Sequence, residues 1–298
     1  MSWFGYGADF VRIKTIGVLA ILGASIMWAI EPIIAKLSFQ SADFIQTSGI
    51  RAIFAAITAL LYIIVSKEFS LSLTRKQVPP VVYIAIVGTL VADLLYFFAL
   101  TMIPVINAVL IGHMQPIFIV VMGWVVLRQD KLNRFDYIGI LVMILSAVFV
   151  TSGSLERLFS LQLGSYGDLI VLGATITWAT AAIVMRRFLR DVHAGVLTFY
   201  RFFLASLVFS GFLLINNGFF IQNYYQIILG VLIGVGTVLY YEGLKRIKAA
   251  QVGALELSTP LFAAVLGFFV LNESIMGLQL IGILLLLVGI YFLSKKEA

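Results

Sequence analysis

The sequence predicts an all-α integral membrane protein with ten transmembrane helices, arranged as two inverted five-helix repeats. Three observations predict this class: an apolar composition, ten apolar runs of membrane-spanning length, and a second half that repeats the first. Only 11% of the 298 residues are charged, 62% are apolar, and the mean hydropathy is +1.09. Because a soluble domain carries about 25% charged residues, lipid is the expected solvent for most of this chain.

The apolar runs give the expected spans. A hydrocarbon core of ~30 Å takes ~20 helical residues per crossing, and continuously apolar runs favour helices over the alternating strands of a barrel. The expected spans are 15–37, 43–65, 81–101, 104–127, 135–151, 167–185, 194–215, 224–244, 249–271 and 276–294. The first repeat is expected over residues 15–151 and the second over 167–294, together forming one transport domain.

The positions of Lys and Arg predict the orientation. An even number of spans places both termini on one side. If that side is the cytoplasm, its segments hold 16 of the 20 Lys and Arg residues, while Lys36 and Arg157 lie outside and Arg51 and Arg201 lie within spans. This is the bias that the positive-inside rule describes. It also explains the net charge of +6 without a nucleic-acid partner.

The two halves share residues at constant spacing. Residues 23–29 align with 173–179 at an offset of 150, and later matches have an offset of 144. The matched pairs include Trp28 with Trp178, Lys36 with Arg186, Arg51 with Arg201, Tyr96 with Tyr240, Pro116 with Pro260, and Gly123 with Gly267. Because each repeat has an odd number of spans, the halves are expected to be inverted. Inverted repeats place a substrate site near the midplane and permit alternating access.

Several short motifs carry a family resemblance. They are the Trp-Ala pair in the first helix of each half, the segment 197–205 (LTFYRFFLA), Thr259-Pro260-Leu-Phe, and Leu271-Asn272-Glu273. With these motifs the chain resembles the drug/metabolite transporter superfamily, specifically its ten-helix EamA group. The first half departs from the pattern, because residues 127–130 (LRQD) stand where the second half has Leu-Asn-Glu.

The resemblance implies export of small molecules from a bacterial cytoplasm: amino acids, related metabolites or drugs. It places the chain in the bacterial inner membrane with both termini cytoplasmic. The expected partners are the substrate and the lipid bilayer, with no obligate protein partner. Amino acids are preferred, since zwitterions suit an aromatic cavity with few charges, and amphiphilic drugs are the alternative.

Ionisable residues at membrane depth are functional candidates. Glu31 and Arg51 are expected ~10–12 Å below the outer surface, counted at ~1.5 Å per residue, and Arg201 and Glu256 at a similar depth from the inner surface. One hypothesis makes these pairs gates that close opposite sides of a cavity. The alternative makes them static ion pairs that tie neighbouring helices.

Asp93 and His113 stand apart from these pairs. After Arg51 and Arg201 are assigned to the two pairs, no basic residue remains at the membrane depth of Asp93. Because burial disfavours its charged form, Asp93 is the candidate for proton coupling. The alternative is a protonated acid bound to a neighbouring hydroxyl. His113 is either a proton relay or a satisfied core donor.

Prolines and aromatic residues complete the candidates. Pro116 and Pro260 are expected to break helices mid-span and free carbonyls for a substrate ammonium group; simple kinks are the alternative. Trp28 and Trp178 are too deep in their spans for the aromatic belt at the membrane interface. They either line a cavity or pack as ordinary core residues. The expected substrate cavity is lined by Trp28, Asp93, Tyr96, His113, Gln115, Trp178, Tyr240 and Ser258.

The sequence lacks the motifs that would indicate another class of protein. The sequence has no phosphate-binding Gly-Lys loop, no HExxH motif and no cysteine. Its two histidines, His113 and His193, belong to different segments of the chain. We therefore expect no cofactor, no metal and no enzyme activity. A channel and an intramembrane enzyme are the weaker alternatives to a carrier.

Overall fold

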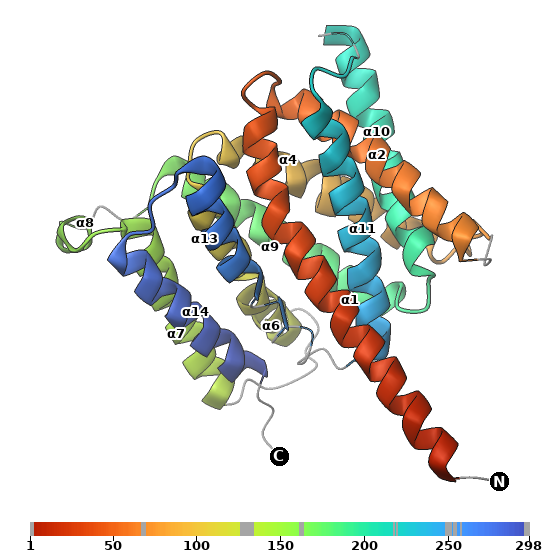
Figure 1. Ribbon diagram of the computed structural model, residues 1–298, viewed down its shortest axis with the longest axis horizontal. Coiled ribbons are helices and arrows are strands. Elements are labelled where there is room, and N and C mark those ends of the chain that lie inside the picture. Colours follow the sequence, from red (N-terminus) through yellow and green to blue (C-terminus); the bar gives the residue numbers. More distant parts are fainter. Residues whose placement is uncertain are drawn as a thin grey trace.

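The computed structural model describes residues 3–66, 70–125, 134–160, 164–216, 218, 220–247, 252, 255–256 and 258–294. Side chains are described between Lys14 and Phe292, apart from Arg186. Every regular element in these ranges is a helix (Figure 1). The helices are α1 Trp3–Ser38, α2 Phe44–Val65, α3 Val78–Tyr83, η1 Ile84–Val91, α4 Ala92–Leu100, α5 Val105–Gly112, α6 Gln115–Val125, α7 Arg134–Ser152, α8 Leu155–Phe159, α9 Tyr166–Phe188, α10 Ala194–Asn216, α11 Tyr224–Arg246, α13 Ser258–Leu271 and α14 Gly277–Ser294.

Eight helical segments are long and apolar enough to cross a membrane. They are Lys14–Ser38, Phe44–Val65, Val78–Leu100, Val105–Val125, Arg134–Ser152, Tyr166–Met185, Ala194–Asn216 and Tyr224–Arg246. The last two expected spans contain shorter apolar helices, Ser258–Leu271 and Gly277–Phe292. The expected start of the ninth span, residues 249–251, lies outside the described residues, as does the segment 127–130.

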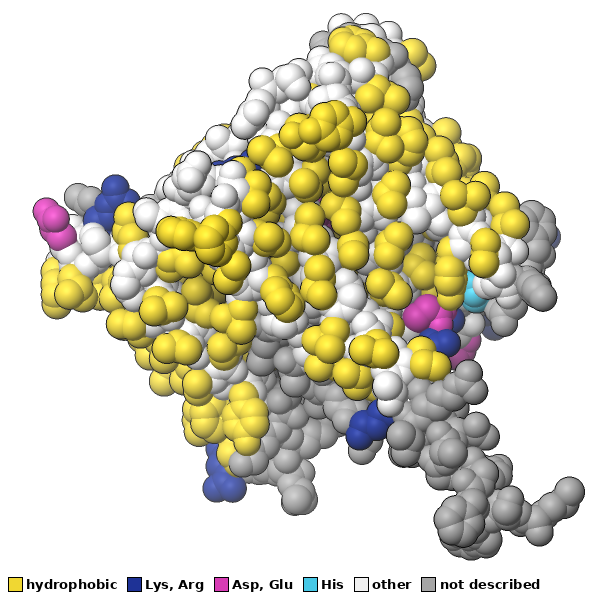
Figure 2. Space-filling view, viewed as in Figure 1, with side chains coloured by type: hydrophobic (Ala, Val, Ile, Leu, Met, Phe, Trp, Pro, Cys, Tyr) yellow, Lys and Arg dark blue, Asp and Glu magenta, His cyan; other side chains and the backbone are white. Residues whose placement is uncertain are grey.

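The outer faces of these helices are apolar. Figure 2 shows hydrophobic side chains across the middle of one face, with the visible charged side chains towards its edges. Leu61, Leu141 and Phe269 expose 57%, 61% and 75% of their surface. In water such a surface would drive aggregation, whereas in a bilayer it faces hydrocarbon. The chain is therefore a multi-pass membrane protein.

The main helix contacts join the first half of the chain to the second. Helix α1 packs on α11, α2 on α10, and α9 on α4 and η1. Helix α5 packs on α13, and α7 lies along α14 (Figure 1). Each half therefore completes its packing on the other.

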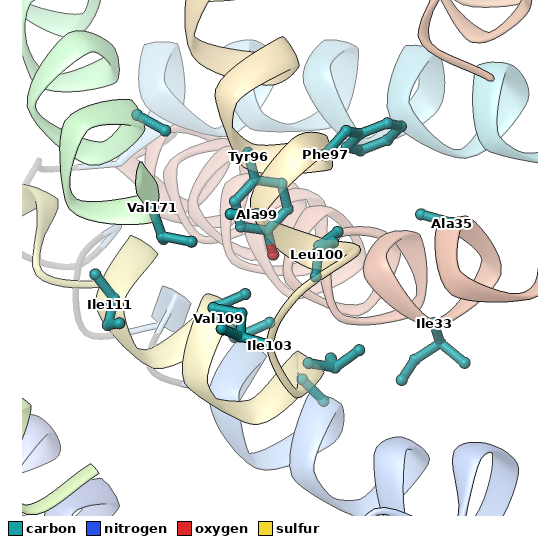
Figure 3. Close-up of a cluster of buried hydrophobic side chains, with 14 of the residues drawn as sticks. Ile33, Ala35, Tyr96, Phe97, Ala99, Leu100, Ile103, Val109, Ile111 and Val171 are labelled. Atoms are coloured by element: carbon teal, nitrogen blue, oxygen red, sulfur yellow. The ribbon is translucent and has the colours of Figure 1, made fainter. Parts of the chain in front are cut away.

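A large apolar core lies between α1, α4, α5 and α9 (Figure 3). Phe97 and Leu100 of α4 are fully buried there, beside Ile33 of α1 and Val109 of α5. Tyr96 precedes Phe97 on the same helix and is 8% exposed. This core holds α4 firmly, and α4 also carries Asp93.

The third segment differs from the expected span 81–101. It begins at Val78, because Pro79 and Pro80 occupy its first turn, where an α-helix needs no amide donor and the fixed φ of proline fits. Its middle, Ile84–Val91, is a π-helix. Such wide turns displace backbone groups from the regular α-helical pattern and are frequent at functional sites.

The fourth segment is interrupted where a break was predicted. Helix α5 ends at Gly112 and α6 begins at Gln115, so Pro116 lies in the first turn of α6. Pro260 likewise lies near the start of α13. In α6 the proline sits where its missing N–H leaves no hydrogen bond unmade.

Glycines allow α11 to approach α2 closely. A Cβ atom added at Gly230 would meet Phe54 and lie 2.7 Å from the Arg51 carbonyl oxygen. A Cβ atom at Gly234 would lie 3.0 Å from the Ala55 carbonyl oxygen. Backbone atoms cannot move aside as a flexible side chain can, so the two helices meet only because these residues are glycine, as in other membrane helix pairs.

We predict that Gly230→Ala destabilises the protein by ~1–3 kcal/mol, the usual cost of overpacking. Gly211→Ala on α10 is the matched control, because nothing lies within 4 Å of its added Cβ atom. Thermal unfolding of both variants in detergent measures the difference. Equal melting temperatures would contradict the close contact between α2 and α11.

Candidate functional site

Four charged side chains from four helices form a buried cluster. They are Glu31 of α1, Arg51 of α2, Asp93 of α4 and Arg201 of α10. Arg51 contacts Glu31 through Nη2 and lies 3.0 Å from Asp93 Oδ2 through Nη1. Arg201 Nη2 lies 3.7 Å from Asp93 Oδ1. Asp93 therefore bridges the two arginines that the repeat places in matching positions.

The burial of this cluster gives its interactions their strength. Arg51 and Asp93 are each 3% exposed. Opposite charges attract strongly at low dielectric, but each also loses its hydration, so a buried pair persists only with good geometry and further hydrogen bonds. Trp178 of α9 supplies one such bond, because its Nε1 donates to Asp93 Oδ1 at 2.8 Å.

The expectation that Asp93 lacks a basic partner is wrong. Depth counting assigned Arg51 to Glu31 and left nothing for Asp93. A guanidinium carries five N–H donors in a fork, so Arg51 binds both carboxylates at once. The proton-coupling role of Asp93, which was inferred from its isolation, loses that support.

Arg201 also has partners other than the expected one. Its Nε donates to Thr89 Oγ1 at 2.5 Å and its Nη2 to the Gly88 carbonyl at 3.1 Å, both on η1. Both acceptors lie on the π-helical turn of η1. The Arg201–Glu256 pair stays a prediction.

Aromatic rings surround the two guanidinium groups. Arg51 Cζ lies 4.8 Å from the centre of the Phe97 ring and 5.8 Å from that of Phe202. Arg201 Cζ lies 5.2 Å from the centre of the Phe202 ring. Ring faces attract cations, with ~2 kcal/mol or more when the cation is desolvated. Phe202 thus lies within reach of both arginines.

The four expected cavity aromatics form two pairs. Trp28 and Tyr240 have ring centres 4.9 Å apart with an interplanar angle of 52°. Trp178 and Tyr96 have centres 5.1 Å apart with an angle of 53°. The repeat relates Trp28 to Trp178 and Tyr240 to Tyr96, so each Trp contacts the tyrosine of the opposite half. The Trp178–Tyr96 pair adjoins Asp93 directly, through the indole N–H.

The remaining expected cavity residues are His113, Ser258 and Gln115, and the contacts described for them are with residues close by in the sequence. His113 ends α5, and its Nδ1 lies 2.7 Å from the Val109 carbonyl oxygen. Ser258 donates to the Leu255 carbonyl at 2.8 Å. Gln115 lies in the first turn of α6, beside Pro116. These contacts cap or close helix ends, as expected where a helix interior is broken.

One functional contact was missed from the sequence. Glu273 follows α13, accepts from the Val105 amide at 2.9 Å and lies 3.1 Å from Lys36 Nζ. It therefore caps α5 and ties it to α1. The preceding Asn272 has φ 53°, a left-handed conformation that asparagine tolerates better than most residues. The Leu271-Asn272-Glu273 motif gave the signal, but the sequence did not show its partners.

A second polar contact joins three helices nearby. Asn107 of α5 donates to Asp168 Oδ1 at 3.3 Å and accepts from Gln279 Nε2 at 2.8 Å. Asp168 also forms the capping box of α9 with Ser165, and Gln279 belongs to α14. All three residues of this contact are buried, so the first turns of α5, α9 and α14 are fixed to one another.

Apolar helices of membrane-spanning length that enclose charged residues are the architecture of a membrane transport protein. The chain belongs to the EamA-like transporter family, which matches residues 15–152 and again residues 165–295. The two matches divide the chain close to the boundary between the expected repeats.

Relatives with curated names are transporters. The uncharacterized transporter sll1164 of Synechocystis sp. is 27% identical over 230 residues, which cover 73% of this chain and 65% of that protein's length. The pseudopaline exporter CntI of Pseudomonas aeruginosa is 24% identical over 192 residues, 64% of each chain. The uncharacterized inner membrane transporter YhbE of Escherichia coli is 24% identical over 255 residues, 83% of this chain and 78% of that one.

A solved structure shares the fold. It matches with a TM-score of 0.66 and 16% identity, over 93% of this chain and 95% of the other. The family and the named relatives are transporters and not enzymes. The expected membership of the EamA group is confirmed.

We predict that Glu273→Ala destabilises the protein by ~1–3 kcal/mol, because the Val105 amide loses its acceptor. Glu273→Gln should cost about 1 kcal/mol or less, since its amide oxygen still accepts and the ion pair with Lys36 is partly exposed. Glu156→Ala on exposed α8 is the control. Thermal unfolding in detergent ranks the three variants, and a wild-type melting temperature for Glu273→Ala would contradict the capping role.

Proposed function

We propose that the chain is a secondary carrier that exports small metabolites, with amino acids as the main class, by alternating access to a site centred on Asp93. The observation that carries the proposal is the contact of one buried carboxylate with Arg51 and Arg201, which occupy matching positions in the two repeats. A site shared by two matching halves is where a carrier of this kind holds its substrate.

The helix contacts support two related halves. If the fourth segment is paired with the ninth and the fifth with the tenth, exchanging the halves maps the most extensive helix contacts onto one another. The contact of α1 with α11 corresponds to that of α9 with α4 and η1, and α2 with α10 corresponds to itself. The two Trp–Tyr pairs have nearly the same geometry. These correspondences favour inverted repeats over an unrelated tandem.

Alternating access then requires contacts that change. In this proposal Glu31–Arg51 closes one side of the site. The Arg201–Glu256 pair closes the opposite side. The longer distance from Arg201 to Asp93, 3.7 Å against 3.0 Å for Arg51, supports Arg201 as the partner that moves.

The substrate class rests on the chemistry of the site and on the resemblance. A cluster of two arginines and two carboxylates within aromatic walls suits a small solute with both a polar and an apolar part. One relative is named a pseudopaline exporter, which supports export as the direction. The bacterial inner membrane is the proposed location.

Counterflow tests the carrier mechanism. Proteoliposomes preloaded with one unlabelled amino acid or amphiphilic drug at a time are diluted into the labelled form. A carrier accumulates label transiently against its own substrate, whereas a channel equilibrates it and an enzyme alters it. Absence of any overshoot across the panel would contradict the proposal.

We predict that Trp178→Phe reduces counterflow about tenfold, because a hydrogen bond to a charged group contributes ~1.5–3 kcal/mol and the ring that packs on Tyr96 is kept. Trp124→Phe, on the exposed face of α6, is the control and should transport as wild type. Both variants should elute from size exclusion as the wild type does. Equal counterflow by the two would remove Trp178 from the site.

The proposed topology has both terminal regions in the cytoplasm. Since the sequence contains no cysteine, a single cysteine at Ser2 or Ser154 is the only target for a thiol reagent. We predict that an impermeant reagent labels Ser154→Cys in intact cells and labels Ser2→Cys only after lysis. The reverse pattern would overturn the topology and, with it, the inverted repeats.

A further inference from the structure

The surroundings of Asp93 are those of a bound carboxylate ligand. Three donors on three different helices converge on its two oxygens: Arg51 of α2, Arg201 of α10 and Trp178 of α9. Two of these helices belong to the second half of the chain and one to the first. Paired guanidinium groups and an indole N–H are groups that bind carboxylates in proteins, through charge-assisted hydrogen bonds.

The donors exceed what Asp93 uses. Arg51 Nε is buried, and the described residues supply it with no acceptor. The other N–H donors of the two guanidinium groups share four acceptors: Asp93, Glu31, Thr89 and the Gly88 carbonyl. A buried donor without an acceptor carries a desolvation penalty, which a further oxygen at this position would relieve. The cluster is therefore able to accept another anionic group.

Charge balance selects the kind of solute. Glu31, Arg51, Asp93 and Arg201 sum to zero formal charge, so a cation or an anion alone would leave a net charge in the bundle. A zwitterion leaves the sum at zero. Its carboxylate can take the place of Asp93 on the arginines, and its ammonium group can then pair with the displaced Asp93.

We propose that Arg51, Arg201 and Trp178 form the binding site for the carboxylate group of a transported amino acid, and that Asp93 occupies this site when substrate is absent. On binding, Asp93 moves to the substrate ammonium group. This inference rests on the proposed carrier function, and it adds the orientation of the substrate and the group that competes with it.

Occupation of the site by Asp93 stabilises the carrier when no substrate is bound. Without Asp93, Arg51 would keep Glu31, whereas the contacts left to Arg201 on η1 are with neutral acceptors, and removing one partner of a buried pair is strongly destabilising. Asp93 keeps both satisfied between transport cycles. It also lowers apparent affinity, because the site is competent only for the fraction of time that Asp93 leaves it.

Three probes with one phenyl ring test the proposal: zwitterionic L-phenylalanine, anionic 3-phenylpropionate and cationic L-phenylalaninamide. Isothermal titration calorimetry of the full purified chain measures each. We expect wild type to bind L-phenylalanine about tenfold or more tightly than the amide, since the amide lacks the charged group that the arginines bind.

The decisive variant is Asp93→Asn, which removes the competing charge. It should bind 3-phenylpropionate about tenfold more tightly than wild type does, because the arginines are no longer occupied. L-Phenylalanine should not gain in parallel, since it loses the partner of its ammonium group. A residue with only a structural role would weaken binding of every probe when replaced.

Trp178→Phe serves if Asp93→Asn fails to fold. It removes one neutral donor, and L-phenylalanine should then bind about tenfold more weakly. Unchanged or weaker binding of 3-phenylpropionate by folded Asp93→Asn overturns the proposal. So does equal affinity of wild type for L-phenylalanine and its amide. Calorimetry measures binding and does not depend on transport. If the probes bind as expected but the protein shows no counterflow, the carrier function is contradicted and the binding site is not.

Discussion

Two arginine side chains lie inside an apolar helical bundle, and each guanidinium group needs acceptors there. Asp93 serves both and thereby joins α2, α4 and α10 at one point. The ion pairs alone do not offset the loss of hydration. Trp178, Thr89 and the Gly88 carbonyl add hydrogen bonds, and Phe202 adds a ring face near both cations. The surrounding helices are held in the positions that these contacts require.

The backbone around this cluster is adapted to it. The π-helix η1 turns the Gly88 carbonyl and the Thr89 hydroxyl towards Arg201. On the other side, α11 approaches α2 so closely that a Cβ atom at Gly230 would meet the carbonyl of Arg51 itself. Close helix contact and ion pairing thus act at the same residue, which limits how far Arg51 can move. Arg201 is the more exposed of the two arginine side chains, at 17% against 4%, and it has more freedom to change partners.

The ends of the helices are fixed by polar contacts outside this cluster. Glu273 caps α5 and pairs with Lys36 of α1, while Asn107, Asp168 and Gln279 connect α5, α9 and α14. Hydrogen bonds to charged groups contribute ~1.5–3 kcal/mol each. In the proposed transport cycle, the buried ion pairs at the centre separate only if each charge gains a replacement partner.

The sequence by itself determined the membrane class, most span positions, the charge asymmetry and the matching halves, because hydropathy and short motifs are properties of local segments. It also identified Glu31, Arg51, Asp93, Arg201 and Trp178 as buried candidates. Only the tertiary structure decided which of them meet. Counting residues along a helix gives only the depth of a side chain in the membrane. Whether two side chains meet also depends on how each helix is rotated about its axis and on how far each side chain reaches. Both are set by packing between the halves. For this reason the depths along the helices matched Arg51 to Glu31 but not to Asp93, and they did not show that Arg201 also lies beside Asp93. The role of Glu273 was also hidden, since its partners Lys36 and Val105 lie more than 160 residues away in the chain.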